Sequence, residues 1–234
     1  LFKFEKPYFD KENMSNEFVG HPLLDETSES KIDINQIIDK NKALISVFPG
    51  SRTSEIKTLM PILMEFIELM NNKYEDFVYI FHSTKQHTDL IKFYLESKGT
   101  KNCEIISDDK IKLHTLKKSV FAVSKSGTVS LEICKCKIPS VIIYKMNIFN
   151  YLIIKALVKI KYVNIINFAA KEEIIPELIQ SKCKSENIFK CVSSFVEDPN
   201  KIKEQVERTQ SILSQFKNSI PASEKASKAI VKFL

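Results

Sequence analysis

The middle of the sequence alternates between short apolar runs and longer segments in which apolar residues recur at helical spacing. The short runs are rich in Val, Ile and Phe and have the length of buried strands. Strands that alternate with helices fold into right-handed βαβ units, which build a parallel sheet covered by helices. We therefore predict an α/β fold with parallel strands at 43–48, 77–81, 103–106, 120–123 and 141–144.

Helical spacing fills the segments between these strands and continues after them. Between Glu55 and Asn71, for example, apolar residues recur every three or four positions and define one buried side. Helices are predicted at 55–71, 86–98, 110–118, 128–136 and 149–160. Beyond Lys171 the pattern is read as entirely helical, at 172–183, 186–197, 201–216 and 222–233, which gives a helical C-terminal tail.

The charge of the chain leaves several kinds of partner open. The formal net charge is +6, but the lysines are scattered, and no basic cluster with interleaved aromatic residues indicates a nucleic-acid interface. A basic surface is equally compatible with a phosphorylated ligand or an anionic membrane. No apolar run is long enough to span a bilayer. Segment 148–160 is interrupted by lysines, so it is read as a helix that packs on the sheet or lies on a membrane surface.

The cysteines and histidines form no recognisable metal or redox motif. The five cysteines include no CxxC pair, and Cys134 and Cys136 are spaced to point to different sides of a helix. The four histidines lack the spacing of a helical metal site. We therefore expect reduced thiols in a cytosolic protein, and no metal site.

Small hydroxyl residues and a glycine follow the fourth predicted strand, at 124–128. Ligands of an open parallel sheet bind beyond the carboxyl ends of its strands, so this turn is a candidate site. We expect Gly127 to allow a tight turn and a close approach to the backbone. The free N–H groups at the start of the next helix suit a phosphate, to which Ser126 and Thr128 can donate their hydroxyls. In the alternative interpretation, Ser126 is only the N-cap of that helix.

Glu132 favours the phosphate interpretation. It lies four residues after Thr128 on the same helical face, and helical side chains lean toward the N-terminus of their helix. Its apolar neighbours predict burial, where an unpaired carboxylate is costly. A phosphate at the helix start with a carboxylate one turn later fits a nucleotide whose ribose hydroxyls bind Glu132. The sequence contains neither GxGxxG nor GxxxxGK[ST], which argues against a dinucleotide-fold dehydrogenase and a P-loop NTPase.

A second strand-to-helix turn lies at 49–55, where Ser51 and Arg52 are candidates for contacts to a diphosphate. Arginine binds phosphate oxygens bidentately. The alternative for Arg52 is a solvated loop charge, which a second anion-binding turn at the same sheet edge makes less attractive. Glu55 is expected to serve only the helix dipole.

With these motifs the chain resembles the lipid-A-disaccharide synthases, membrane-associated glycosyltransferases with two Rossmann-like domains in the GT-B arrangement. The resemblance rests on Phe18–Leu23, Pro49–Arg52 with Glu55, Ser126–Thr128 with Leu131 and Glu132, Pro139–Tyr144, Tyr162 and Val163 with Asn167, and Glu177–Gln180. It implies an inverting transfer from UDP-2,3-diacylglucosamine to 2,3-diacylglucosamine 1-phosphate, without metal or cofactor. The products are lipid A disaccharide 1-phosphate and UDP.

The resemblance also assigns roles to individual residues. It implies that Arg52 lies near the UDP diphosphate and that Glu132 binds the ribose. The full set of implied UDP-binding residues is Arg52, Ser126, Gly127, Thr128, Glu132, Asn167 and Gln180. The family usually has a proline where this sequence has Ile166, which implies a looser loop before Asn167.

The family architecture divides the chain into three parts. Residues 1–40 are expected to form an interdomain crossover segment, and 41–200 a Rossmann-like donor-binding domain. The helices of 201–234 are expected to pack on an N-terminal domain or on a partner. That N-terminal domain, which is expected to hold the general base and the acceptor region, precedes the part represented here. The expected partners are the UDP-sugar donor, the lipid acceptor, the cytoplasmic face of the bacterial inner membrane, and a separately encoded N-terminal half or a second copy.

Two other functions remain open from the sequence. One is a non-catalytic nucleotide-sugar-binding module, or a decayed remnant of the enzyme. The other is a UDP-sugar 2-epimerase on the same scaffold, which is expected to carry a histidine- and arginine-rich motif that this sequence does not contain.

Overall fold

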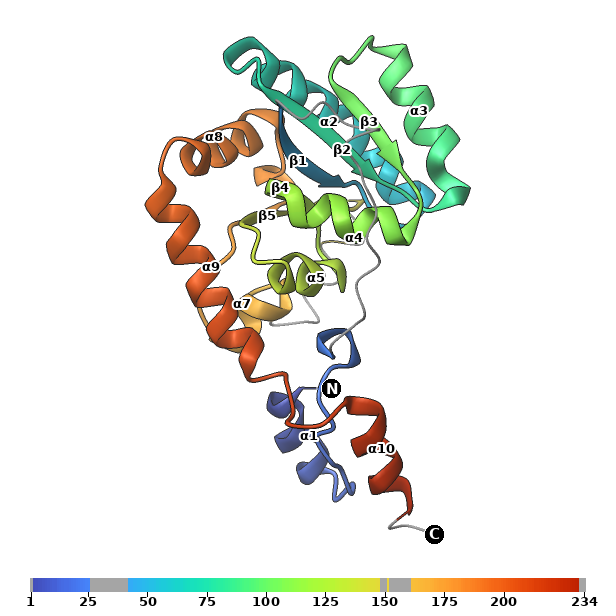
Figure 1. Ribbon diagram of the computed structural model, residues 1–234, viewed down its shortest axis with the longest axis vertical. Coiled ribbons are helices and arrows are strands. Elements are labelled where there is room, and N and C mark those ends of the chain that lie inside the picture. The colour runs from blue at the N-terminus through green and yellow to red at the C-terminus, as the bar shows by residue number, and fades with distance from the viewer. Residues whose placement is uncertain (1, 26–41, 148–150, 152–160, 232–234) are drawn as a thin grey trace.

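A six-stranded parallel sheet forms the centre of the molecule (Figure 1). The computed structural model describes residues 2–25, 42–147, 151 and 161–231. The strands are β1 (Ala43–Phe48), β2 (Phe77–His82), β3 (Cys103–Ile106), β4 (Ser119–Lys125), β5 (Ser140–Tyr144) and β6 (Glu177–Ile179). Their order is β3-β2-β1-β4-β5-β6, and each neighbouring pair is parallel. The parallel sheet and the five predicted strands are confirmed, whereas β6 was not predicted.

Helices cover both faces of the sheet, and one further helix, α10 (Ala222–Val231), lies below it (Figure 1). After β1 the helices are α2 (Thr53–Lys73), α3 (Thr88–Ser97), α4 (Asp109–Lys118), α5 (Val129–Lys135), α7 (Ile165–Ala170), α8 (Ser185–Val196), α9 (Pro199–Ser214) and α10. Seven of these match predicted helices to within a few residues, and α7 does not. A short 3-10 helix, η4 (Lys85–His87), precedes α3. The helix predicted at 149–160 lies outside the described residues apart from Tyr151.

The alternation of side chains along each strand divides the core into two halves. Ile45 and Val47 of β1 pack with buried residues of α2, α3 and α8 in the largest apolar cluster. Leu44 and Phe48 of the same strand belong to smaller clusters on the opposite face, which α4 and α5 cover. Successive residues of a strand point to opposite faces, so a strand that is apolar at every position must be covered on both sides.

The prediction of a helix at 172–183 is wrong. Pro176 has no N–H to donate and disfavours helical backbone at the residue before it. The chain therefore runs extended as β6, whose Glu177 pairs with Ile142 of β5, and then forms the short 3-10 helix η5 (Gln180–Lys182). The unpredicted α7 has six residues and begins after Asn164, whose side chain accepts a hydrogen bond from the Ile166 N–H at 2.8 Å.

The first and last described segments lie together below the sheet domain (Figure 1). This lower lobe contains η1 (Lys3–Glu5), α1 (Lys6–Lys11), η2 (Pro22–Leu24) and α10. The His21 N–H donates to the Phe216 carbonyl at 3.0 Å, and the Asn218 amide donates to the Phe18 carbonyl at 3.3 Å. Segment 18–25 and the segment after α9 are therefore joined directly. None of the described helices is both long and apolar enough to cross a membrane.

Candidate functional site

The carboxyl ends of β1 and β4 lie side by side, with Phe48 paired to Ser124. The chain leaves β1 for α2 on one face of the sheet and leaves β4 for α5 on the other. The two turns therefore diverge from a common point, which is where ligands bind in open α/β sheets. The structure thus brings together the two turns predicted at 49–55 and 124–128, and a Lys125–Glu55 ion pair of 3.1 Å connects them.

The turn after β1 is shaped around the Glu55 carboxylate. This carboxylate accepts a hydrogen bond from the Ser51 N–H at 3.1 Å and lies 3.5 Å from the Arg52 guanidinium. Gly50 has a φ of +117°, and a Cβ there would lie 2.7 Å from a Glu55 oxygen, so only glycine fits. Glu55 therefore determines the loop conformation, which is a larger role than the predicted effect on the helix dipole. The Arg52 side chain is 79% exposed and can turn toward a ligand.

The turn after β4 differs in detail from the prediction. Gly127 does not adopt left-handed backbone, so the turn itself does not require glycine. A Cβ at Gly127 would meet no atom within 4 Å, so the space above the turn is open. The Ser126 hydroxyl donates to the Val163 carbonyl at 3.2 Å, and Thr128, not Ser126, is the N-cap of α5. The first N–H groups of a helix, here those before Ser130, have no acceptor within the helix.

Glu132 is only partly buried, and it has a protein partner that the sequence did not predict. Its carboxylate lies 2.8 Å from the Lys112 ammonium of α4, and the side chain is 27% exposed. The expected cost of an unpaired buried carboxylate therefore does not arise. One of its oxygens is anchored, while the carboxylate still lines a cavity of about 450 Å³ between α4, α5 and η2.

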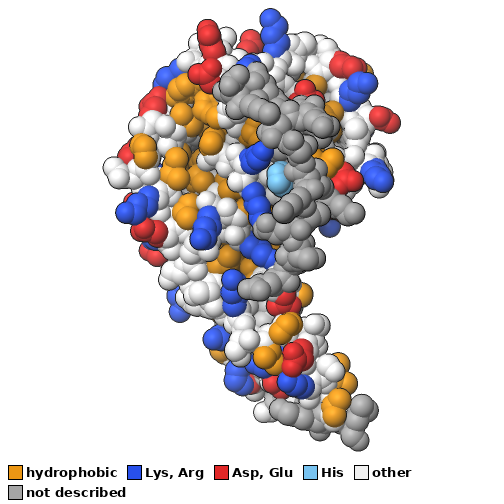
Figure 2. Space-filling model, in the orientation of Figure 1, with side chains coloured by type: hydrophobic (Ala, Val, Ile, Leu, Met, Phe, Trp, Pro, Cys, Tyr) orange, Lys and Arg blue, Asp and Glu red, His pale blue; other side chains and the backbone are white. Residues whose placement is uncertain are grey.

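The walls of this cavity combine apolar and charged groups. The residues around it are Pro22, Leu23, Asp109, Lys112, Leu113, Glu132 and Lys135. The Lys135 ammonium donates to the carbonyls of Leu23 and Asp25 at 2.8 and 2.7 Å, so it fastens segment 22–25 against α5. Except for Glu132, the lining residues were not predicted, because their proximity depends on how α4, α5 and η2 meet. Figure 2 shows several Lys and Arg side chains gathered along the middle of the face on which α4 and α5 lie.

Asn167 is fully buried, and its carboxamide is fully occupied by protein groups. Its oxygen accepts hydrogen bonds from the N–H groups of Ile174 and Ile175, both at 2.9 Å. Its nitrogen donates to the Ile175 carbonyl at 2.7 Å and to the Glu177 carboxylate at 2.8 Å. In this geometry Asn167 holds the chain around α7 and has no remaining hydrogen-bonding capacity for a ligand.

Glu177 extends this network toward the turn after β4. Its two oxygens accept the N–H groups of Val163 and Asn164, both at 2.9 Å. The carbonyl of the same Val163 accepts the Ser126 hydroxyl. Glu177 therefore fixes the loop on which the Ser126 turn rests. Glu177 belongs to a segment that carries the family resemblance, but the sequence predicts no role for its carboxylate.

Gln180 holds the chain that follows β5. Its carboxamide oxygen accepts from the Met146 N–H at 2.8 Å, and its nitrogen donates to the Met146 carbonyl at 3.2 Å. Gln180 has a φ of +52°, a left-handed conformation that costs a non-glycine residue about 1 kcal/mol. The two bonds to Met146 offset this cost. As with Asn167, the side chain is bonded to protein rather than open to solvent.

A buried histidine lies below the same sheet edge, at the end of β2. The Ser119 hydroxyl donates to the Thr115 carbonyl, so Ser119 accepts from Ser46 at 2.7 Å. Ser46 must then accept from the His82 Nε2–H at 2.9 Å, which leaves His82 Nδ1 as an acceptor without a partner. The imidazole stacks on Phe48 with ring centroids 4.2 Å apart. Burial, and secondarily the Lys112 charge, lower the pKa of His82 to about 3.

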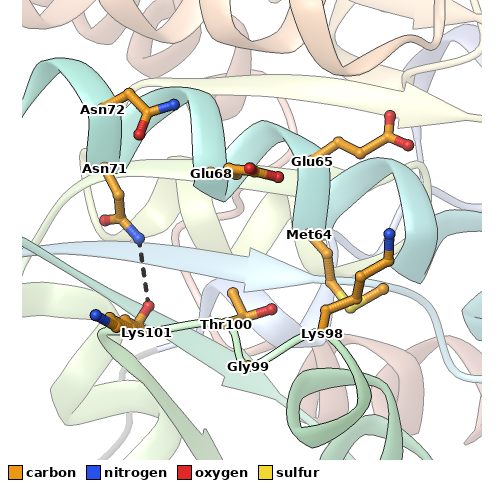
Figure 3. A pocket seen from close by; sticks show the side chains of 9 residues that line it. All are labelled: Met64, Glu65, Glu68, Asn71, Asn72, Lys98, Gly99, Thr100 and Lys101. Carbon is orange, nitrogen blue, oxygen red and sulfur yellow. Dashed lines mark hydrogen bonds between the residues drawn. The ribbon is translucent and has the colours of Figure 1, made fainter.

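A second cavity of about 250 Å³ lies at the opposite edge of the sheet, between α2 and the loop that leads into β3 (Figure 3). Glu65 and Glu68 approach it from the helix, and Lys98 and Lys101 from the loop. None of the predicted site residues lines it. Within the described ranges, no group of three or more His, Cys, Asp or Glu side chains is placed to hold a metal ion.

Comparison with known proteins decides which family carries this arrangement. The family model described as lipid-A-disaccharide synthetase matches residues 1–231. The chain belongs to the lipid-A-disaccharide synthase family. Its relatives include the lipid-A-disaccharide synthases of Rickettsia prowazekii strain Madrid E, 34% identical over 220 residues, and Rickettsia bellii strain OSU 85-389, 33% identical over 237 residues. These alignments cover 92% and 98% of this chain, but only 57% and 61% of the relatives.

Solved structures support the GT-B fold. UDP-GlcNAc 2-epimerase from Neisseria meningitidis bound to UDP-GlcNAc superposes with a TM-score of 0.59 at 16% identity, over 86% of this chain and 47% of that one. Spinosyn rhamnosyltransferase SpnG complexed with thymidine diphosphate gives a TM-score of 0.53 at 10% identity, over 81% and 46%. At these identities the likeness concerns the fold alone. The sheet of this lipid-A-disaccharide synthase family member is thus one Rossmann-like unit of that fold.

Proposed function

We propose that the chain supplies the donor-binding half of a lipid-A-disaccharide synthase, which transfers the sugar of UDP-2,3-diacylglucosamine to 2,3-diacylglucosamine 1-phosphate. The observation that carries this proposal is the continuity of the site. Glu132 lines the cavity and lies one helical turn after the turn with open space at Gly127, and the exposed Arg52 lies on the adjacent turn. A nucleoside pocket that leads into an anion-binding turn is what a nucleoside diphosphate requires.

Each part of UDP has a complementary group in this arrangement. The apolar surfaces of Pro22, Leu23 and Leu113 suit a flat base. The Glu132 carboxylate has acceptor capacity beyond its bond to Lys112 and suits the ribose hydroxyls. The diphosphate would then lie over Gly127 and Thr128, within reach of Arg52. An arginine side chain binds phosphate oxygens bidentately. In this proposal Ser126, Asn167 and Gln180 act mainly by holding the surrounding loops in place.

Replacement of Gly127 by alanine tests the phosphate position directly. The backbone there is not left-handed and the added methyl group meets no protein atom within 4 Å. We therefore expect Gly127→Ala to leave the free energy of unfolding unchanged within about 0.5 kcal/mol. The methyl group would occupy the proposed phosphate position, so UDP affinity should fall at least about tenfold, the equivalent of about 1.4 kcal/mol. Isothermal titration calorimetry measures this, and full UDP affinity in a folded Gly127→Ala variant would contradict the proposal.

Glu132→Ala provides a second, independent test at the ribose. We expect weaker binding of UDP, because the variant removes an acceptor for the sugar hydroxyls. Binding of inorganic pyrophosphate, which carries no ribose, should change less than UDP binding. Equal losses of affinity for UDP and pyrophosphate would mean that Glu132 does not act through the ribose.

The complete reaction also needs an acceptor site and a general base, for which we propose a second protein portion. The chain spans about three fifths of the length of the relatives it matches. The lower lobe exposes large apolar side chains, at Tyr8, Phe9, Met14, Ile230 and Val231. Such side chains are suited to contact with the N-terminal portion of the family.

Reconstitution tests this part of the proposal. We expect lipid A disaccharide 1-phosphate to form only when the N-terminal portion of a relative is added to the chain, in an assay that contains donor, acceptor and detergent or inner-membrane vesicles. Formation of the product by the chain alone would contradict the need for a second portion. UDP binding without activity in any mixture would favour a non-catalytic nucleotide-sugar-binding module.

A further inference from the structure

A carboxylate lies between the two turns that form the proposed diphosphate site. Glu55 belongs to the turn that carries Ser51 and Arg52, and its side chain is only 15% exposed. The loop depends on it, because Gly50 and the Ser51 N–H both pack against its carboxylate. A partly buried negative charge repels an approaching diphosphate more strongly than a solvated one. The site therefore needs a permanent compensating charge if it is to bind an anion.

Lys125 is placed to supply that charge. Its ammonium lies 3.1 Å from a Glu55 oxygen, and its side chain is only 20% exposed. The ammonium also lies 5.2 Å from the centre of the Tyr144 ring, a distance at which a cation is attracted to an aromatic face. Burial alone would raise the pKa of Glu55. The bonds from Lys125 and from the backbone of Ser51 and Arg52 together lower this pKa by more than burial raises it, so the carboxylate is ionised at neutral pH.

The two cations beside Glu55 differ in their freedom. Lys125 is held between Glu55 and Tyr144, whereas Arg52 is 79% exposed and only 3.5 Å from the carboxylate. Exposed ion pairs contribute little and exchange partners easily. Arg52 can therefore leave Glu55 for a phosphate, and Lys125 remains to balance the carboxylate.

We propose that Lys125 is a positioning residue of the diphosphate site, which neutralises Glu55 so that Arg52 is available to the ligand. This inference rests on the proposed function. It predicts that Lys125 increases the affinity for a ligand in proportion to the phosphate charge of that ligand. It also predicts that this effect of Lys125 depends on the presence of Glu55. A lysine that bound the phosphate directly would instead matter whether or not Glu55 were charged.

A double-mutant cycle tests this dependence, with the variants Lys125→Met, Glu55→Gln and the combination of both. Binding of UDP and of uridine to each full-length variant is followed by NMR titration, with thermal unfolding as a check of folding. We expect Lys125→Met to weaken UDP binding about tenfold and to leave uridine binding within about twofold. Glu55→Gln should bind UDP at least as tightly as the unmodified chain. The double variant should recover most of the UDP affinity that Lys125→Met loses.

A matched lysine elsewhere controls for the loss of an ion pair. Lys73 pairs with Glu197 at 2.6 Å on the surface, away from the proposed site, so Lys73→Met should change neither affinity. A double variant that binds UDP as weakly as Lys125→Met would overturn the inference, as would equal losses for UDP and uridine in Lys125→Met. If the unmodified chain binds no UDP, the proposed function fails together with this inference. If it binds UDP and Lys125→Met retains full UDP affinity, only this inference fails.

Discussion

His82 makes the stability of the protein depend on pH in a way that can be calculated. The imidazole is buried, its Nε2–H is bonded to Ser46, and its Nδ1 has no partner to stabilise an added proton. Burial, together with the nearby Lys112 charge, lowers the pKa of His82 from 6.5 to about 3. The unfolded chain therefore binds a proton in a pH range in which the folded chain does not. Stability from this residue is complete above pH 6.5 and declines as the pH falls toward about 3.

The size of the effect follows from the two pKa values. The full difference between 6.5 and about 3 corresponds to about 5 kcal/mol. Between pH 7.5 and 5.5 only the unfolded state titrates, and the free energy of unfolding should fall by about 1 kcal/mol through His82 alone. His82→Gln keeps a side-chain donor for Ser46 but cannot be protonated. The variant loses some stability at every pH, but it should lack this pH-dependent part.

Urea unfolding, followed by circular dichroism at pH 7.5, 6.5 and 5.5, measures the effect. We compare the change in unfolding free energy with pH in the unmodified chain and in His82→Gln, because this difference removes the contributions of all other groups. We expect the decrease between pH 7.5 and 5.5 to be about 1 kcal/mol smaller in the variant. The same decrease in both proteins would show that His82 titrates normally in the folded state, and would refute the hydrogen-bond directions from Ser119 through Ser46 to His82.

Three further substitutions test the loops around the site. Gly50→Ala forces a side chain into left-handed backbone and against the Glu55 carboxylate, so urea unfolding should show the free energy of unfolding lowered by about 3 kcal/mol. The control Gly99→Ala, whose added Cβ meets no atom within 4 Å, should lose about 1 kcal/mol, and equal losses would argue against the contact with Glu55. Asn167→Ala leaves several buried groups without hydrogen-bond partners, so the free energy of unfolding should fall by about 3 kcal/mol in thermal or urea unfolding. A fall below about 1 kcal/mol would contradict the structural role of Asn167. Lys112→Met removes the ion-pair partner of the Glu132 carboxylate, so calorimetry should show the preference for UDP over 2′-deoxy-UDP reduced about threefold. An unchanged preference would mean that the ion pair does not orient Glu132.

The central sheet was predictable because its strands are apolar at nearly every position. A strand covered on both faces gives a continuous apolar run, and the helices between such runs have their own periodicity. The errors arose where an element is short. β6 has three residues at the edge of the sheet, and the surrounding segment has helix-like apolar spacing. Pro176 was the available signal against a helix, because it cannot donate a backbone hydrogen bond.

For the candidate site, the sequence predicted the loops but not the contacts between them. The turns that contain Arg52 and Gly127 were predicted correctly at the carboxyl edge, because parallel strands all end at the same side. The partners of Glu132 and Glu55 were not predicted, since Lys112 and Lys125 meet them only through packing between distant elements. Asn167 and Gln180 have the polar side chains expected of ligand contacts, and only the geometry shows that these groups bond to backbone.

The pairing of β1 with β4 has a consequence for how the protein acquires its binding capacity. These neighbouring strands are separated in sequence by β2 and β3 with their helices, so their contact closes a long loop of chain. Contacts of this kind cost much chain entropy and slow folding. The proposed nucleotide site spans this pairing, so a partly folded molecule that has not formed it has no site to offer. UDP would then bind only molecules with the complete sheet, and its presence during refolding would raise their population by mass action.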